Sequence, residues 1–247
     1  MPTSAPHRLH LPTPQFWGLC VVVFMMMQLP LVRMPVLFLS TWAHELGHGL
    51  GAIATGGRFL ELTVYPSLSG VALTQTYGAF SRVMVIVGGL LGPSVLGVIL
   101  IALTRAFGRY RFALILLAAI LALSLVWAAD AFTLAAVGGA AAITALCAWK
   151  LPERVLLYVG TMVAIALCLS ALTGFGYFFI GNAVVAGAEY RSDTGVLADL
   201  WGGPHWLWGG VMAALSVAIL ALGVFASDRW ARRREERLAA ATRSEPL

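Results

Sequence analysis

The residues best able to do chemistry lie together at positions 41–50, which read TWAHELGHGL and contain the pattern HExxH. On a helix, His44 and His48 lie one turn apart on the same face, so their two imidazoles can bind one zinc ion. Glu45 lies beside them and can accept a proton from a water held by the metal. The pattern therefore predicts a zinc site in which Glu45 is the catalytic base.

The surroundings of this pattern bear on whether the site is functional or structural. The other residues at positions 41–50 are uncharged, whereas a surface helix of a soluble protein carries charged residues on its other faces. Two histidines at this spacing can also form a structural pair or bind a haem. Ionisable residues inside an apolar run are costly to bury, which favours a functional site.

The composition indicates an integral membrane protein. Of the 247 residues, 60% are hydrophobic and only 11% are charged, which is too apolar for a soluble domain of this length. The net charge of +5 is small and gathers in short loops and near the C-terminus. It therefore predicts the orientation of the chain in a lipid bilayer, with basic loops in the cytoplasm, and argues against nucleic-acid binding.

The apolar blocks predict an all-α polytopic membrane protein with about six or seven transmembrane helices. The blocks span residues 16–32, 36–55, 80–103, 112–149, 155–172 and 206–225, and the fourth is long enough for two short helices. Pro35 can start the second helix, which carries HExxH. We expect a flexible N-terminal tail over 1–15, one membrane-embedded domain over 16–226, and a basic C-terminal tail over 227–247 that frays.

Two segments between these blocks are less apolar. Residues 58–78 alternate between apolar and polar types on either side of a turn at 66–70, which predicts a β-hairpin, with a plain connecting loop as the alternative. Because bare strands cannot face lipid, the hairpin must be buried in protein or lie at the membrane surface. Residues 173–202 contain repeated glycines and polar residues, which indicate a re-entrant stretch able to reach a site at membrane depth.

A catalytic zinc ion usually has three protein ligands, so HExxH leaves one ligand to come from elsewhere in the chain. A carboxylate is the best candidate. Asp193, in the re-entrant stretch, and Asp130, between two short spans, both fit this role, and each could instead cap a helix. Weaker acidic candidates are Asp199, Glu189 and Glu61. The remaining histidines lie in the N-terminal tail or after a helix break, and are His7, His10 and His205.

The sequence resembles the M50 family of membrane metallopeptidases, the site-2-protease-like proteins, and within it the M50B branch. The resemblance covers about residues 35–225. It rests on TWAHELGH at 41–48, the hairpin-like segment after it, GPSVLG at 92–97 and RSDTGVLA at 191–198. The first motif is specific, and the others match the family in general texture.

This resemblance implies a zinc-dependent intramembrane endopeptidase whose substrate is a transmembrane segment of another protein. In the family, the third ligand is an aspartate in a Leu-Asp-Gly motif that opens a late membrane helix. Here SDT at 192–194 holds that place, which makes Asp193 the implied ligand. The family also implies that the hairpin presents the substrate as an added strand, here with Ser69 and Gly70 at its turn, and that Asn182 orients the substrate.

Two other functions are compatible with the sequence. The chain could be a non-catalytic membrane scaffold or chaperone that binds a metal through a protease-like fold. A small transporter using Asp130 and Glu189 is a third hypothesis, although the lack of an internal repeat argues against it. We expect the protein to lie in a cell membrane, most simply that of a bacterium.

Overall fold

A computed structural model describes residues 11–185 and 187–244, with side chains described as far as Arg237. Helices dominate, and two short hairpins interrupt them. The helices are α1 Thr13–Met26, α2 Pro30–Ala54, α3 Gly78–Ile101, α4 Tyr110–Ser124, α5 Ala131–Lys150, α6 Glu153–Thr173, α7 Asp193–Trp201 and α8 His205–Ser244. The strands are β1 Arg58–Val64, β2 Gly70–Gln75, β3 Asn182–Val185 and β4 Ala188–Arg191, and the short helical turns are η1 Ala102–Ala106, η2 Leu125–Trp127 and η3 Gly174–Phe179.

Within the described residues, five helical segments are long and apolar enough to cross a membrane. They are Gly78–Ala106, Tyr110–Trp127, Ala131–Lys150, Glu153–Phe179 and His205–Arg237. A sixth candidate span is the pair α1 and α2, which are bent by 102° at a short break. The predicted polytopic helical membrane fold is confirmed, with α4 and α5 as the two short helices expected at 112–149.

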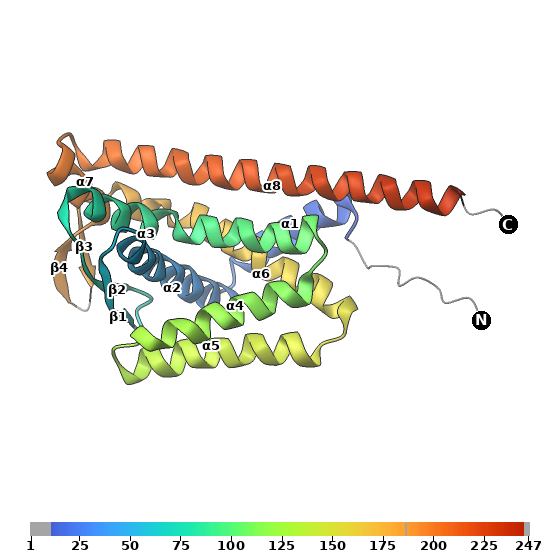
Figure 1. The fold of residues 1–247 in the computed structure, drawn as a ribbon, viewed down its shortest axis with the longest axis horizontal. Helices are drawn as coiled ribbons and strands as arrows, with labels where there is room; N and C mark the ends of the chain where they lie inside the picture. Colours follow the sequence, from blue (N-terminus) through green and yellow to red (C-terminus); the bar gives the residue numbers. More distant parts are fainter. Residues whose placement is uncertain (1–10, 186, 245–247) are drawn as a thin grey trace.

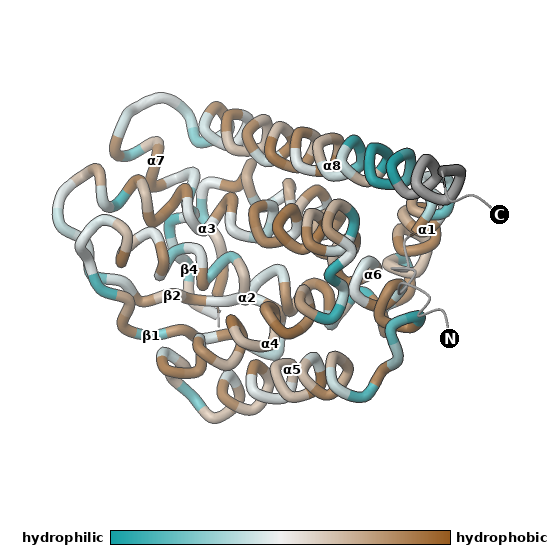
Figure 2. Tube along the Cα trace, turned by 45° about the vertical axis from the view of Figure 1, so that its right-hand side comes forward, coloured by the Kyte–Doolittle hydropathy of each residue, from teal (hydrophilic) through white to brown (hydrophobic). Residues whose placement is uncertain are grey.

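The helices form a bundle with the hairpins gathered at one end. Figure 1 shows α8 along one edge of the molecule and α4 and α5 along the opposite edge. Both hairpins and α7 lie at the same end. Figure 2 shows mainly hydrophobic residues along the helices and a hydrophilic end of α8.

The first two helices divide at a different point from the one predicted. The sequence predicts spans at 16–32 and 36–55 with Pro35 starting the second, but α1 ends at Met26 and α2 begins at Pro30. Pro30 occupies the first turn of α2, where a missing backbone N–H costs nothing, and Pro35 lies inside the helix. Most of the predicted N-terminal tail falls on residues 1–10, which lie outside the described part of the chain.

The HExxH helix α2 packs with its backbone directly against α3. Gly47 and Gly51 on α2, and Gly88 and Gly92 on α3, have no room for a side chain, because a Cβ on any of them would overlap the backbone of the opposite helix. Small residues at this spacing allow two membrane helices to approach closely. The glycine-rich side of α2 is therefore the surface that fixes the HExxH helix on α3.

The hairpin predicted at 58–78 is confirmed as β1 and β2, which pair antiparallel. The outer edge of β1 is covered by the chain that leads into α5. The backbone N–H of Ala129 donates to the Leu62 carbonyl at 3.0 Å, and the backbone N–H of Val64 donates to Thr133 Oγ1 at 3.0 Å. The open edge of this hairpin is therefore the edge of β2.

The register of the hairpin shows which groups that open edge presents. Leu62 pairs with Ala72, and Val64 pairs with Gly70. In an antiparallel pair, two residues either bond to each other or both direct their backbone groups outward. The backbone groups of Leu62 and Val64 hydrogen-bond to residues outside the hairpin. Their partners Ala72 and Gly70 therefore direct their own backbone groups to the open edge of β2.

A short helical turn, a second hairpin and a short helix lie within 173–202, where the sequence predicts a re-entrant stretch. The strands β3 and β4 pair from Asn182 with Arg191 to Val185 with Ala188. Ser192 caps α7, and the helix gives way to Gly202–Pro204 before α8. The hairpin escapes prediction because each strand has only four residues.

Helix α8 continues well beyond the membrane-spanning length. It runs to Ser244, so the prediction that the chain frays from Ser227 is wrong for residues 227–244. Asp228 pairs with Arg232 one turn along the helix at 2.8 Å and with the buried Arg105 at 2.8 Å. These pairs, together with many good helix formers in this stretch, favour a continued helix.

Candidate metal centre

Three side chains that can bind a metal meet where α2 approaches the start of α7. His44 Nε2 lies 3.1 Å from Asp193 Oδ2, His48 Nε2 lies 3.4 Å from the same oxygen, and the two Nε2 atoms lie 3.0 Å apart. Among the described residues, this is the one group of three such side chains with ligand atoms all within 4.8 Å of one another. Ligand atoms of a tetrahedral zinc site lie roughly 3.3 Å apart, given bonds of about 2.0–2.1 Å, so the group fits one ion.

Helix α3 sets the orientation of the second histidine. His48 Nδ1 lies 2.9 Å from the Val85 carbonyl oxygen. Because a carbonyl can only accept, Nδ1 carries the proton in this contact. The lone pair of Nε2 is then directed toward the point between His44 and Asp193 where an ion would lie. A Cβ on Gly89 of α3 would overlap the His48 ring. Both the tautomer and the position of His48 therefore depend on α3.

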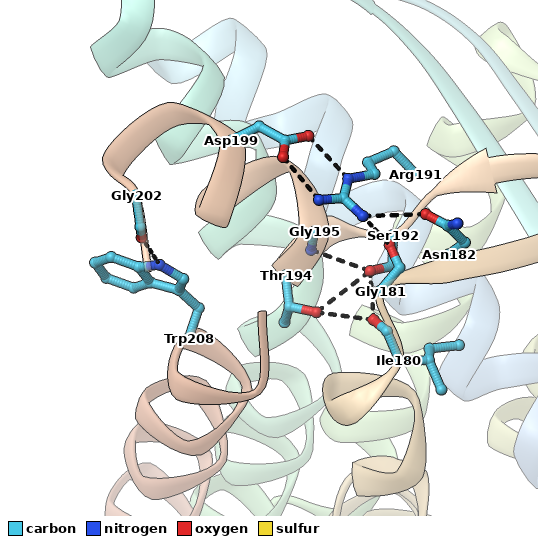
Figure 3. A network of polar contacts seen from close by, with 10 residues as sticks. All are labelled: Ile180, Gly181, Asn182, Arg191, Ser192, Thr194, Gly195, Asp199, Gly202 and Trp208. Carbon is cyan, nitrogen blue, oxygen red and sulfur yellow. Dashed lines mark hydrogen bonds and ion pairs between the residues drawn. The ribbon is translucent and has the colours of Figure 1, made fainter. Parts of the chain in front are cut away.

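Asp193 is held in place by the two hydroxyl residues that flank it. Ser192 Oγ and Thr194 Oγ1 both donate to the Ile180 carbonyl, at 2.6 and 3.2 Å (Figure 3). Both residues are buried, with exposed fractions of 1% and 0%. Ser192 Oγ also accepts from the Gly195 backbone N–H at 3.1 Å. These bonds tie the start of α7 to the chain that precedes β3.

An exposed ion pair ties the second hairpin to α7. Arg191 binds both carboxylate oxygens of Asp199, at 2.8 and 2.7 Å, and also donates to the Gly181 carbonyl and to Asn182 Oδ1 (Figure 3). The hydrogen bond from Arg191 lowers the pKa of Asp199. Asn182 donates in turn to Glu189 at 2.9 Å. Asp199 and Glu189, two of the weaker ligand candidates, thus have their partners within this segment.

Tyr177 is a member of the site that the sequence does not reveal. Its hydroxyl donates to Asp193 Oδ2 at 3.4 Å, and its ring meets the His44 imidazole edge-on with centroids 5.6 Å apart. It lies in η3, in the stretch GFGYFF, where it is the one residue with a hydroxyl among three phenylalanines. That hydroxyl is the only signal in the sequence that singles it out.

Glu45 lies beside the open edge of β2. Its exposed fraction is 6%, and the Ala72 backbone N–H faces its carboxyl group. Gly70 comes so close that a Cβ there would lie 2.6 Å from Glu45 Cγ. The first hairpin therefore places a strand edge directly beside the residue predicted to carry the proton.

A cavity of about 450 Å³ opens at this place. It is bordered by His44 and Glu45 on α2, and by the three residues predicted from the family resemblance to contact substrate, Ser69, Gly70 and Asn182. The site on α2 and the predicted substrate contacts thus share one cavity. The Asn182 side chain is itself bonded within the second hairpin.

Asp130, the alternative third ligand, lies in a different setting. It caps α5, where the Thr133 backbone N–H and hydroxyl donate to its carboxylate at 2.9 and 2.7 Å. These bonds lower the pKa of Asp130. Glu61 lies on an exposed position of β1. Among these described acids, the structure brings Asp193 alone to the two histidines. His205 begins α8, and His7 and His10 lie outside the described residues.

Comparison with known proteins identifies a family for most of the chain. Residues 17–223 match the family model described as Peptidase M50B-like. No curated protein and no solved structure matches the chain. The matched range includes HExxH, both hairpins and Asp193.

Proposed function

The chain belongs to the Peptidase M50B-like family, and on this premise we propose that it is a zinc-dependent endopeptidase that cleaves transmembrane segments of other proteins. One observation carries the proposal: His44, His48 and Asp193 meet beside Glu45, and His44 and Glu45 border a cavity. The span-capable helices and the family together indicate an integral membrane protein. A bacterial cell membrane as its location is part of the proposal.

The proposed roles follow from helix geometry. His44, His48 and Asp193 hold the zinc ion, which would supply Lewis-acid activation of the attacking water and of the scissile carbonyl. Adjacent helix positions point about 100° apart, so Glu45 does not share the face of the histidines and is free to move a proton. Glu45 accepts the proton of the attacking water and then donates it to the nitrogen of the leaving amine.

The proposed substrate is an extended segment, because a peptide bond inside a helix is shielded by the surrounding turns. The open edge of β2 presents the backbone groups of Gly70 and the carbonyl of Ala72 beside Glu45, and an unwound segment can add to that edge as a further strand. Thr41 Oγ1 donates to the Leu68 carbonyl at 2.8 Å and so ties the turn of this hairpin to α2. The strand edge and Glu45 are therefore held together.

Metal analysis tests the site itself. The purified protein should bind about one zinc ion per chain, because two imidazoles and one carboxylate make a three-ligand site. His44→Ala and His48→Ala should each remove most of this zinc. Full zinc content in both variants would exclude the site.

A cleavage assay tests the mechanism. The probe is a Leu- and Ala-rich transmembrane peptide with a central glycine-containing segment. Glu45→Gln keeps the side-chain size and removes the base, so it should retain zinc and thermal stability while single-turnover cleavage falls roughly a hundred- to ten-thousand-fold. The control is Glu61→Gln, at an exposed position of β1.

The outcomes separate the peptidase from the non-catalytic scaffold considered from the sequence. Undiminished cleavage by Glu45→Gln would contradict the proposed mechanism. A zinc-loaded protein that cleaves no member of a panel of such peptides would support the non-catalytic metal-binding scaffold instead.

A further inference from the structure

The second hairpin borders the same cavity as the first. All four residues of β3, Asn182–Val185, line it together with Ser69, Gly70 and Glu45. In the described part of the chain, β3 pairs with β4 alone, so its other edge has no strand beside it. Val184 is 70% exposed. Figure 1 shows both hairpins at the same end of the molecule.

The register identifies the free backbone groups of β3. The Ser192 backbone N–H donates to the Gly181 carbonyl at 3.1 Å, so these two residues, next to the paired Asn182 and Arg191, form a hydrogen-bonded pair. Bonded and unbonded pairs alternate along an antiparallel hairpin, so Asn182 with Arg191 and Val184 with Glu189 are unbonded pairs. The N–H and C=O groups of Asn182 and Val184 therefore point away from β4.

An unwound membrane segment needs more than one strand edge. A strand presents its N–H and C=O groups alternately on its two sides, and each group left unpaired in apolar surroundings costs free energy. The open edge of β2 can satisfy one side of an added strand. The groups on the other side of that strand would still need partners.

We propose that β3 provides the second edge of the substrate cleft, so that an extended substrate segment hydrogen-bonds to β2 on one side and to β3 on the other. This inference rests on the proposed function, because it concerns the same cleft and the same class of substrate, an unwound transmembrane segment. The four residues of β3 extend over about 13 Å, at roughly 3.3 Å per residue, and match about four substrate residues.

The same segment of chain joins this edge to the metal site. Strand β4 ends at Arg191, and α7 begins at Asp193. The proposed substrate-binding strand and the proposed third ligand are therefore parts of one continuous segment. A substrate bound along β3 would therefore contact the same segment of chain that positions Asp193.

Disulfide trapping tests this inference without any need for turnover. The background is the full chain carrying Glu45→Gln, to which either Val184→Cys or Ser69→Cys is added. Alanine replaces the three native cysteines, Cys20, Cys147 and Cys168. The probe is the same model peptide with one cysteine moved through its central segment. Both variants should trap the peptide most strongly at every second position, because side chains of a strand alternate between its faces.

Each outcome of the trapping experiment decides something. Trapping with a two-residue period from Ser69→Cys but not from Val184→Cys would overturn the role of β3 and leave the proposed function standing. Trapping from Val184→Cys at every third or fourth position would mean a helical substrate and would also overturn it. If neither variant traps the peptide, the strand-like binding mode in the proposed function fails as well.

A pair of proline substitutions gives a second test. Val184→Pro removes an N–H from the open edge of β3, whereas Glu189→Pro, at its cross-strand partner, removes one from the far edge of the same hairpin. Val184→Pro should raise KM for the model peptide roughly three- to tenfold, the worth of about one hydrogen bond. Because the Glu189 side chain also accepts from Asn182, Glu189→Pro is compared with Glu189→Ala, which removes that side-chain bond alone, and should differ from it in KM by less than about twofold. Both proline variants should retain zinc. Equal changes of KM in Val184→Pro and, relative to Glu189→Ala, in Glu189→Pro would overturn the proposal.

Discussion

The two halves of the candidate metal site are held in place by different means. Helix geometry places His44 and His48 one turn apart on α2, and the backbone of α2 packs against α3. Asp193 lies at the start of a nine-residue helix and is fixed by the hydroxyls of Ser192 and Thr194. The histidine half thus depends on close contact between two backbones, and the aspartate half depends on a few polar side chains. Substitutions can test each dependence separately.

The largest effect should come from removing the carboxylate itself. Asp193→Ala should weaken zinc binding by more than the roughly 10–100-fold that outer partners of a metal site typically contribute, because it deletes a proposed ligand. Asp130→Ala should leave zinc affinity unchanged, since Asp130 only caps α5. Zinc affinity of both variants is measured by competition with a chelator at equal folded fraction. Loss of metal in Asp130→Ala alone would show that the third ligand is misassigned.

The next largest effect should come from the backbone contact beside His48. In Gly89→Ala, the new Cβ would overlap the His48 ring, so the imidazole must move away from the other ligands. Zinc affinity should fall about tenfold or more, the range seen when outer partners of a ligand are disturbed. Gly139→Ala is the matched control, because open space surrounds Gly139 on α5. Unchanged zinc affinity in Gly89→Ala would contradict the dependence of His48 on α3.

A smaller effect is expected from the hydroxyl that helps to hold Asp193. Thr194→Val keeps the shape of this fully buried side chain but removes its hydrogen bond to the Ile180 carbonyl. Zinc affinity should fall roughly three- to tenfold, below the 10–100-fold typical of outer partners, because Ser192 still bonds to the same carbonyl. Thr194→Ser restores the hydroxyl and should recover most of the affinity. Equal zinc affinity in the valine and serine variants would assign Thr194 a purely packing role.

The same contrast explains how much of the molecule could be predicted from its sequence. The face of α2 that carries both histidines needs only the helical period, so the spacing of His44 and His48 is enough to predict it. The first hairpin follows from the alternation of residues in seven- and six-residue strands around a turn. The helix boundaries near Pro30 and Pro35 are ambiguous because either proline can occupy a first turn.

The aspartate half could not be predicted in the same way. Asp130 and Asp193 both stand at the start of a helix, where each can be interpreted as a cap, and the sequence favours Asp193 through the re-entrant stretch and the family resemblance. The tertiary contact between α7 and the two histidines then separates the two acids in the structure. Tyr177 and the four-residue strand β3 share this difficulty, because their positions depend on how distant segments meet.

Asp130 should show the smallest effect on the metal and a measurable effect on folding. The Thr133 backbone N–H and hydroxyl donate to its carboxylate and hold the pKa of Asp130 below its ordinary value of 3.8. A lowered pKa in the folded state means that folding stabilises the ionised form. This contribution is fully present above the ordinary pKa and is lost as pH falls through the lowered value. Asp130→Ala should therefore reduce the free energy of unfolding by about 1 kcal/mol at pH 7, the usual worth of an N-cap, without changing zinc affinity. Thermal unfolding of the unmodified protein and the variant, in the same detergent at pH 7 and at pH 3, should show the difference between them shrinking at the lower pH. A difference that stays constant between these two pH values would mean that Asp130 stabilises α5 by packing, without a contribution from its charge.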